Sequence, residues 1–403
     1  MNILQLCKKF PYPEKDGESI AISNLSRALV KVGCRITLLA MNTSKHHTDV
    51  SALPPNYNHY SDIHFVDIDN RITLWRAFKN LCTNESFHVK RFYSKSFEDK
   101  LIKLLRANNY DIIIMETLYL SAYIDVIRKW SKAKIVMRSH NVEFEIWERI
   151  TANVKNPLKK WYLGILTKRL RKFEESSLSK YDLLATVTQK DLEFYRRIGF
   201  RGRGLALPIG LELGNYAAKD SDSPIPYSIC FIGAMDWVPN REGLEWFLKA
   251  VWPRLFTEFP TLSFHVAGRN TPEDFKHKII PGVRIYGEVD DAIQFINNCE
   301  LMVVPLFSGS GMRVKILEGM ALGKPVLSTD LGMEGIDAIK GQEILIANTA
   351  EQFYYEIKRF LIDERHLINQ IDNKSRNYVS KHFDQQKIVA KLINELELEL
   401  KKV

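Results

Sequence analysis

The chain of 403 residues predicts an α/β protein built from two Rossmann-like domains. Short apolar runs alternate with helical patterns in two successive series, which is typical of βαβ units in parallel sheets. Residues 198–227, rich in Gly and Pro, separate the two series and form the natural linker. We therefore expect a first domain over 1–205, a second domain over 206–380 and a final helix over 381–403.

The first domain begins with a strand over residues 2–7, a long Pro-rich loop and a helix over 19–32 that ends at Gly33. Further strands are predicted over 35–40, 111–115, 134–138 and 182–187. Parallel strands point the same way, so their carboxyl ends share one edge of the sheet. Open α/β sheets bind their ligands at that edge.

Two polar side chains follow predicted strands at this edge. Glu116 comes directly after the strand over 111–115, and His140 lies just after the strand over 134–138. Both are candidates for contact with a substrate. The alternatives are an acid at a helix N-terminus for Glu116, and a structural or exposed ring for His140.

The second domain has its most informative pattern at residues 301–328. An apolar strand over 301–305 leads into the glycine-rich turn 307–311, and a helix follows that ends at Gly323. Free N–H groups and the positive end of the helix dipole favour a phosphate at a helix start, and glycines let the backbone approach it. The pattern predicts an anion site, with a plain capped helix as the alternative.

Charged residues of the same helix fit this interpretation. Arg313 and Lys315 add positive charge in a first turn, where a helix alone would favour acids. Glu318 lies further along and could accept hydrogen bonds from a ribose diol. The alternative is a surface ion pair between Lys315 and Glu318, three residues apart.

The rest of the second domain continues the alternation of strands and helices. Strands are predicted over 228–233, 262–267, 283–287 and 343–346, one helix over 244–256, and further helices through 350–400.

Charge and cysteine content narrow the classes of partner. Residues 1–205 hold 35 Lys and Arg against 21 Asp and Glu, a net charge of +14, and the remainder carries −5. The basic half suits an anionic lipid, a membrane surface or a nucleic acid, with solubility charge as the alternative. No run of 18 apolar residues predicts a membrane span, and no signal peptide is recognisable. Five scattered cysteines suit reduced thiols, so we expect a cytoplasmic protein.

Residues 155–172 combine seven Lys and Arg residues with Trp, Tyr, Leu and Ile. This composition is typical of a helix that lies at a membrane interface, so contact with the inner face of the cell membrane is one possibility. The alternative is a charged helix packed on the first sheet. No nucleic-acid-binding module is recognisable, and we expect no nucleic acid partner.

Residues 318–326, E-G-M-A-L-G-K-P-V, resemble the donor-site signature of the retaining glycosyltransferases of family 4, also called group 1. The family pattern has a first Glu eight residues before Glu318, where this chain has Ser310. In the family the first acid contacts the transferred sugar and the second holds the nucleotide ribose. A subgroup with G-S-G-x-R-x-K-x-L-E is similar to residues 309–318, so we interpret Ser310 as a variant.

The resemblance implies the GT-B fold, in which two domains face across a cleft and the C-terminal helix returns to the first domain. It also implies that the donor lies on the second domain and the acceptor mostly on the first. The cations that usually hold the diphosphate are missing after Gly233, so we expect arginine and lysine side chains elsewhere to replace them. The donor-binding residues implied are Gly17, Gly233, Arg241, Ser310, Gly311, Met312, Arg313, Lys315 and Glu318.

The resemblance implies a retaining, metal-independent glycosyltransferase that needs no cofactor. It would move a sugar from a nucleotide-diphosphate sugar to a glycan or lipid-linked acceptor, in cell-surface polysaccharide synthesis. The segment S-H-N-V-E-x-E-I-W-E-R resembles the family's, so His140, together with Glu116, would contact the donor sugar or the acceptor. The alternatives are a non-catalytic nucleotide-sugar-binding protein and a GT-B-fold epimerase.

Overall fold

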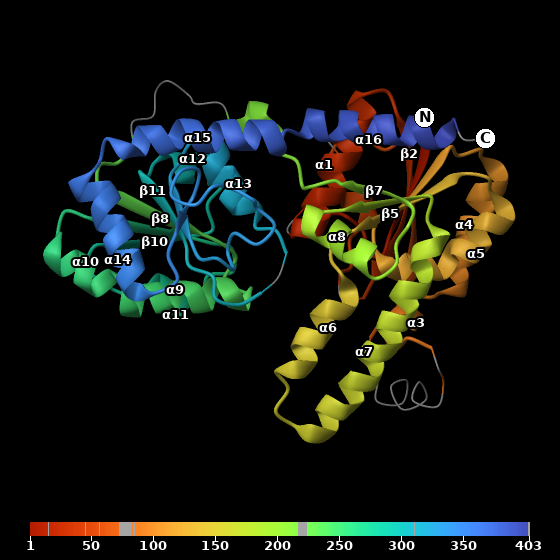
Figure 1. Ribbon diagram of the computed structural model, residues 1–403, viewed down its shortest axis with the longest axis horizontal. Helices are drawn as coiled ribbons and strands as arrows, with labels where there is room; N and C mark the ends of the chain where they lie inside the picture. Colours follow the sequence, from red (N-terminus) through yellow and green to blue (C-terminus); the bar gives the residue numbers. More distant parts are fainter. Residues whose placement is uncertain are drawn as a thin grey trace. The chain divides into compact units, whose positions relative to one another are not determined.

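The computed structural model describes residues 1–14, 16–44, 46–55, 57–71, 83, 85–216, 224–309 and 311–401. The chain forms two compact units, one made of Met1–Gly210 with Gln385–Val403 and the other of Leu211–Asp384. Each unit is a parallel sheet covered by helices, so the predicted α/β fold class is confirmed (Figure 1).

The first unit has, in its described residues, a parallel sheet of seven strands in the order β3-β2-β1-β4-β5-β6-β7. The strands are β1 (Asn2–Cys7), β2 (Arg35–Thr43), β3 (Asp62–Ile68), β4 (Ile112–Met115), β5 (Lys134–Ser139), β6 (Leu183–Thr186) and β7 (Arg203–Ala206). The order of the strands reverses between β1 and β4. At such a switch point the connecting segments diverge and leave room for a ligand at the carboxyl edge.

Apolar layers cover both faces of this sheet. Successive side chains of a strand point to opposite faces. Leu4 and Leu6 accordingly join one buried cluster, while Ile3 and Cys7 join the other. The helical segments of the unit are α1 (Gly17–Lys31), η1 (Val50–Ala52), α3 (Phe87–Lys90), α4 (Lys95–Ala107), η2 (Leu118–Tyr123), α5 (Ile124–Trp130), α6 (Glu143–Ala152), α7 (Pro157–Ser177), η3 (Leu178–Lys180), α8 (Gln189–Arg197) and α16 (Gln385–Leu400).

Helix α16 closes the chain and packs beside α1 on the first unit (Figure 1). Its apolar stripe is buried in the same cluster as Ile3 and Leu29. Arg203, on the edge strand β7, adds ion pairs to Glu395 at 3.0 Å and to Glu399 at 2.7 Å. The predicted return of the final helix to the first domain is therefore confirmed.

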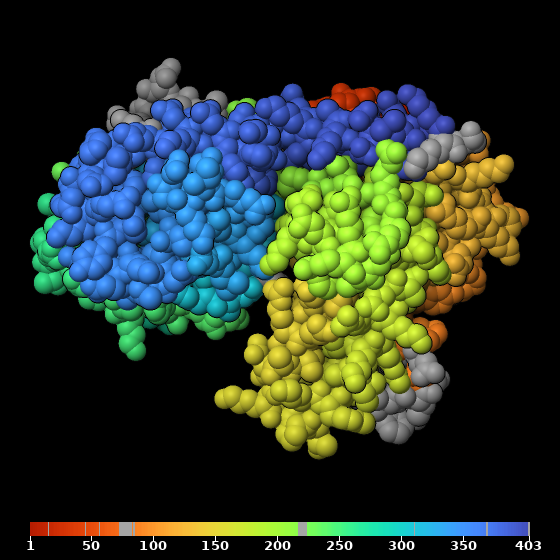
Figure 2. Space-filling model, in the orientation of Figure 1, coloured from red at the N-terminus to blue at the C-terminus, as the bar shows by residue number. Residues whose placement is uncertain are grey.

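Helices α6 and α7 form a hairpin that stands out from the rest of the first unit (Figure 2). The hairpin is anchored at its base by Glu174 of α7, which accepts hydrogen bonds from the N–H groups of Glu143 (3.2 Å) and Phe144 (3.0 Å) at the start of α6. Its far end carries exposed apolar side chains, with Leu158 78% and Trp161 64% exposed. In the described parts of the chain, no helix combines the length and apolarity that crossing a membrane requires.

The second unit has, in its described residues, a parallel sheet of six strands in the order β10-β9-β8-β11-β12-β13. The strands are β8 (Ser228–Ile232), β9 (Ser263–Ala267), β10 (Val283–Gly287), β11 (Leu301–Val304), β12 (Val326–Ser328) and β13 (Leu345–Ile346). The helical segments are η4 (Leu213–Tyr216), α9 (Val238–Ala250), α10 (Trp252–Glu258), α11 (Glu273–Lys276), α12 (Ala292–Asn297), α13 (Val314–Ala321), α14 (Ala350–Lys358), η5 (Arg359–Asp363) and α15 (Leu367–His382).

The prediction of a single helix over 244–256 was wrong, because two helices, α9 and α10, occupy this region. Pro253 has no N–H group to donate, and its ring would clash with the carbonyl four residues earlier in a continuous helix. The first helix therefore ends before Val251, and Pro253 lies in the first turn of α10.

The strand and the helix predicted within residues 301–328 are confirmed as β11 and α13, and β12 follows the helix. Gly309 and Gly311 have φ angles of +97° and +87°, which residues with a Cβ atom rarely adopt. Gly323, with φ of +71°, ends α13. The strand order reverses between β8 and β11, so α9 and α13 both start at the switch point of this sheet.

Four of the cysteines, Cys7, Cys34, Cys230 and Cys299, are buried free thiols, and Cys82 lies outside the described residues.

Candidate functional site

Glu116 is completely buried at the carboxyl end of β4 and lies in a compact polar cluster. Its Oε1 accepts a hydrogen bond from Gln5 Nε2 at 2.6 Å, and its Oε2 accepts from Arg138 Nη1 at 3.2 Å and from His140 Nε2 at 3.1 Å. Burial would raise the pKa of Glu116, but the charge of Arg138 and the bonds from His140 and Gln5 outweigh it and lower that pKa. Glu116 is therefore an ionised carboxylate whose two oxygens are already bound by side chains of the protein.

His140 is held by this carboxylate in a defined orientation. A carboxylate can only accept, so the proton lies on His140 Nε2 and the ring's Nδ1 is the nitrogen that a substrate group can approach. The His140 side chain keeps 10% of its surface exposed, whereas Glu116 has none. The two predicted residues are thus brought together, with Glu116 positioning His140.

Two further members of the cluster, Gln5 and Arg138, escaped the sequence analysis. Both are polar residues inside the apolar strands β1 and β5, and both are at most 2% exposed. A charged residue within an apolar strand is rarely buried without a partner, so Arg138 was a signal that could have been used.

Gly17 is the first residue of α1 and is exposed. A Cβ atom there would meet open space, so this structure gives no steric reason for glycine. Asp16 caps the helix by accepting from Ser19 N at 3.0 Å, and also binds Lys9 Nζ at 2.6 Å. Glu18 in the first turn pairs with Lys8 at 3.3 Å.

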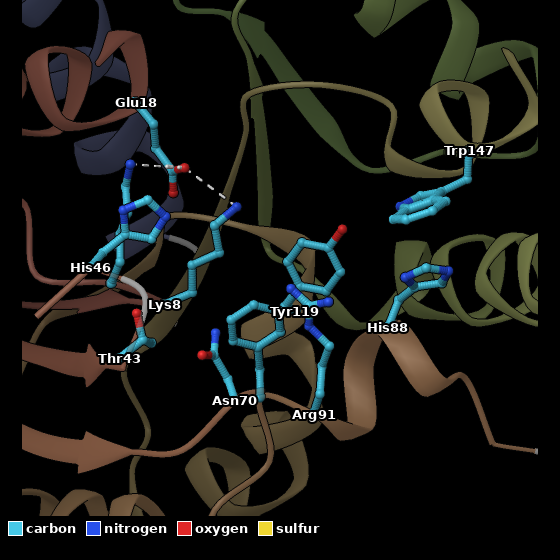
Figure 3. Close-up of a pocket in the computed structure, with 11 residues that line it drawn as sticks. Lys8, Glu18, Thr43, His46, Asn70, His88, Arg91, Tyr119 and Trp147 are labelled. Atoms are coloured by element: carbon cyan, nitrogen blue, oxygen red, sulfur yellow. Dashed lines mark ion pairs between the residues drawn. The ribbon is translucent and has the colours of Figure 1, made fainter. Parts of the chain in front are cut away.

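A cavity of about 220 Å³ opens beside Glu18 at the carboxyl edge of the first sheet (Figure 3). The connections after β1, β2 and β3 line it, together with α1, α3, η2 and α6. Burial raises the pKa of Glu18, but the charges of Lys8, Lys9 and His140 outweigh this effect and lower that pKa.

Lys315 is the central residue of the predicted anion site in the second unit. Its Nζ donates to the carbonyl of Ile232 at 3.0 Å and to Asn240 Oδ1 at 2.7 Å, and lies 4.9 Å from the ring centre of Phe231. Burial lowers the pKa of Lys315 to about 7, with a smaller effect of Arg313, while Glu318 acts in the opposite direction. The surface ion pair considered as an alternative is absent among the described contacts, because the amine bonds to neutral oxygens instead.

Arg313 precedes α13 and is buried. Its guanidinium donates to the carbonyl of Gly311 and lies 5.3 Å from the ring centre of Trp237. It thereby links the glycine turn to the start of α9. Met312 lies half-buried between Gly311 and Arg313, and Ser310 lies outside the described residues.

Glu318 accepts a hydrogen bond from the hydroxyl of Tyr216 at 3.1 Å. Burial raises the pKa of Glu318, although the Tyr216 bond and the charge of Lys315 lower it. Tyr216 belongs to η4, far away in sequence, so no local pattern could have identified it.

Gly233 lies where β8 meets α9, and the packing there is close. A Cβ atom on Gly233 would lie 2.6 Å from Asn240 Nδ2, and one on Gly268 would lie 2.0 Å from the Gly233 carbonyl oxygen. Asn240 also donates to the carbonyl of Ala234 at 2.9 Å, which fixes the amide that holds Lys315. Arg241, one residue further along α9, has an exposed side chain.

No group of three or more metal-ligating side chains is found within the described ranges. Two Asp-x-Asp spacings occur in the sequence, Asp67-Ile68-Asp69 at the end of β3 and Asp220-Ser221-Asp222, which lies outside the described residues. Asp67 accepts from Asn42 Nδ2 at 2.9 Å, and Asp69 binds Arg71 through two bonds of 2.9 Å.

We predict that Glu116→Gln lowers the free energy of unfolding by about 3–5 kcal/mol, because Arg138 then stays buried without its counter-charge. Folding lowers the pKa of Glu116, so its stabilising effect is fully present above the unfolded pKa of about 4.3 and is lost as the pH falls through the folded value. Urea unfolding at pH 7 and at lower pH should show the difference between the two proteins shrinking below about pH 4. Glu193→Gln, an exposed site on α8, is the control, and equal effects of both variants would contradict the assignment.

Comparison with known proteins finds similarity to one family in the second unit. Residues 226–363 match the model of the glycosyl transferases group 1. An uncharacterized 44.6 kDa protein in the cps region of Klebsiella pneumoniae is 22% identical over 306 residues, which cover 71% of this chain and 74% of that protein. An uncharacterized glycosyltransferase of Methanosarcina acetivorans is 24% identical over 307 residues, covering 73% of this chain and 75% of that protein.

The crystal structure of Anabaena HepE in complex with UDP matches with a TM-score of 0.69 at 13% identity, over 98% of this chain and 100% of that one. The two parallel-sheet units are those of the GT-B fold. The matched residues include β8, α9, β11 and α13, the elements that hold Lys315 and its partners. Residues 226–363, within the second unit of this GT-B chain, are therefore similar to the glycosyl transferases group 1.

Proposed function

We propose that this protein is a retaining glycosyltransferase of family 4 that moves a sugar from a nucleotide-diphosphate sugar to a glycan or lipid-linked acceptor. The group 1 match supports sugar transfer, and the HepE structure that this chain resembles contains UDP. The relative from the cps region supports a place in cell-surface polysaccharide synthesis. Donor binding is assigned to the second unit and acceptor binding to the first.

The observation that carries the proposal is the environment of Lys315. The ammonium group is buried among neutral hydrogen-bond acceptors, and burial without a counter-charge favours its neutral form. An arriving diphosphate would supply the missing negative charge and restore the charged amine. Glycines with positive φ before α13 let the backbone of this turn approach the same anion.

The other donor contacts follow from this placement. Gly311 and Met312 would present N–H groups, Arg313 would add a second cation, and Glu318 would accept from the ribose hydroxyls. Ser310 keeps its proposed role on the strength of the motif alone. Arg241 and Gly17 also stay predictions.

Catalysis would consist mainly of stabilising the leaving diphosphate. Breaking the bond between the anomeric carbon and the phosphate develops positive charge on the sugar and negative charge on the leaving group. Arg313 and Lys315 would balance that negative charge, so the proposal requires no metal ion. Retention requires the acceptor hydroxyl to attack from the face that the diphosphate leaves, and His140, oriented by Glu116, would contact the sugar or acceptor.

We also propose peripheral membrane contact through the end of the α6–α7 hairpin. Leu158 and Trp161 are exposed there beside Lys155, Lys159 and Lys160. Further along α7, Leu166 and Leu170 are buried, so only the first part of the predicted segment 155–172 offers its apolar side chains to a bilayer. The mixed basic and apolar surface suits anionic lipid headgroups.

The first prediction of this function concerns nucleotide binding. UDP, GDP, ADP and CMP should be compared by thermal shift, and one of them should raise the melting temperature by several degrees, since a ligand at 100 times its Kd stabilises by about 2.7 kcal/mol. Lys315→Met and Glu318→Ala should each lose most of the shift. Lys249→Met, at the exposed far end of α9, should keep it.

A wild-type protein that none of these nucleotides stabilises would contradict the donor site. Release of UDP from UDP-sugars then separates an enzyme from a binding protein, because only a catalyst breaks the glycosyl bond.

The second prediction is that nucleotide binding takes up a proton at pH 8. With a pKa of about 7, Lys315 is mostly neutral in the free protein at this pH, and a bound diphosphate would raise its pKa again. Calorimetry in buffers of different ionisation enthalpy should give an uptake approaching one proton per nucleotide. Affinity should weaken as the pH rises above 7. Lys315→Met should abolish the uptake, and an uptake that persists in this variant would assign the proton to another group.

The third prediction is that the protein co-sediments with vesicles of phosphatidylglycerol and phosphatidylcholine at low salt, and less so as the ionic strength rises. Trp161→Asp should reduce the bound fraction at least threefold. Ile279→Asp is the matched control, since Ile279 is 99% exposed on the second unit. Equal binding of both variants would exclude the hairpin as the contact.

A further inference from the structure

The cavity beside Glu18 contains buried polar atoms that the protein itself leaves without hydrogen-bond partners. Within the described parts of the chain these are Glu18 Oε1, Thr43 Oγ1, His88 Nε2 and Arg91 Nε. They come from three separate segments, which are α1, the end of β2, and α3 with the residue that follows it. Buried polar atoms are rarely left unpaired, because each loses its hydration without compensation. Four of them around one cavity indicate a polar ligand.

Among the cations that line the cavity, Arg91 is the one without an ion pair in the described contacts, although the charge of Glu143 acts on it. Lys9 pairs with Asp16 at 2.6 Å, and Glu18 lies 3.3 Å from Lys8 and 3.7 Å from Lys9. Arg91 makes no ion pair within the described contacts and lies 4.8 Å from the ring centre of Phe92. Burial lowers the pKa of Arg91, but a guanidinium stays charged at neutral pH. One guanidinium without a direct ion pair suits a monoanion better than a doubly charged phosphate.

The shape of the Arg91 guanidinium narrows the chemical class of the ligand further. A guanidinium is a planar fork of N–H donors that matches the two oxygens of a carboxylate. Figure 3 shows Arg91 and Tyr119 between Glu18 with Lys8 on one side and His88 with Trp147 on the other. His88 is a neutral donor or acceptor there, since burial and the charge of Arg91 lower its pKa to about 4.

Aromatic rings form the remaining wall. The Trp147 and His88 rings are 4.0 Å apart, and Tyr119 lies 5.0 Å from Phe92. The Tyr119 hydroxyl donates to Glu143 at 2.7 Å, which fixes the ring. Flat aromatic faces suit the C–H face of a pyranose ring, while the unpaired polar atoms suit its hydroxyl groups.

The size of the cavity limits the ligand to about one ring. Its volume of about 220 Å³ is below the roughly 300–1,000 Å³ typical of sites for drug-sized ligands. We propose that the cavity binds a hexuronate residue of the acceptor, with the carboxylate on Arg91 and the ring against Trp147 and Tyr119. The proposal deepens the proposed function and rests on it, because it treats the first unit as the acceptor side. Arg91 would be a specificity-determining residue.

The test is binding of methyl β-D-glucuronide to the full-length protein, measured by ligand-observed NMR or calorimetry. Methyl β-D-glucoside should bind at least tenfold more weakly, and so should the glucuronide to Arg91→Gln. Arg91→Lys should lose most of the preference, because the ammonium keeps the charge without the planar fork. Arg201→Gln, an exposed arginine of the same unit, should behave as wild type.

A second measurement separates a binding role from a structural one. Since Arg91 has no ion pair among the described contacts, Arg91→Gln should melt no lower than wild type and should keep the nucleotide-induced thermal shift of the second unit. Equal affinity for glucuronide and glucoside would overturn the proposal, as would tighter binding of glucose 6-phosphate than of glucuronide. If the glucuronide binds while no nucleotide does, the proposed function fails and the hexuronate site stands. The reverse result leaves the glycosyltransferase and removes the hexuronate.

Discussion

The parallel order of both sheets is the constraint on which the chemistry of this chain depends. Neighbouring strands of each described sheet are parallel, so every strand of a unit ends at the same edge. In the first unit this edge gathers the residues after β1, β4 and β5, although those after β1 lie more than 100 residues before the others in the sequence. In the second unit it brings the start of α9 next to the start of α13. Each site lies at the switch point of its own sheet, where the connections diverge.

Buried charge is handled in two different ways at the edge of the first sheet. Glu116 and Arg138 compensate each other, with Gln5 and His140 filling the remaining hydrogen-bonding positions, so this cluster contributes to a rigid fold. Arg91 and its neighbours around the cavity are left incomplete, which costs stability in the free protein. The contrast distinguishes Glu116, which positions other side chains, from the groups around the cavity, whose hydrogen-bonding positions are open to a ligand. Lys315 in the second unit resembles Arg91 in this respect, since its hydrogen bonds satisfy the amine without neutralising its charge.

The sequence predicted most of the strands, the two-unit organisation of the fold and the glycine turn before α13, because those depend on local patterns of apolar residues and glycines. It missed β3, and it was wrong about β7 (Arg203–Ala206), which lies within the predicted linker 198–227 and pairs with β6 of the first sheet. It also identified Glu116 and His140 as candidate site residues, since each directly follows a recognisable buried strand. It could not give the direction of the Lys315 side chain. The i,i+3 spacing to Glu318 suggested a surface pair, whereas the partners are Asn240 and the Ile232 carbonyl, 75 and 83 positions away. The helix break at Val251 was missed because the apolar periodicity continues through Pro253.

The cavity beside Glu18 was beyond sequence reasoning for a related reason. Its wall takes one or two residues from each of several connections, and none of these connections has a distinctive motif. Its charge becomes meaningful only when the pairs are known, because the basic composition of the first unit does not tell which cation lacks an acid. The ion pairs therefore identify one specific guanidinium, that of Arg91, within the general excess of positive charge. An enzyme that recognises its acceptor by one such group gains selectivity between sugars that differ only in the oxidation state of one carbon, since the neutral sugar would leave Arg91 buried and unpaired.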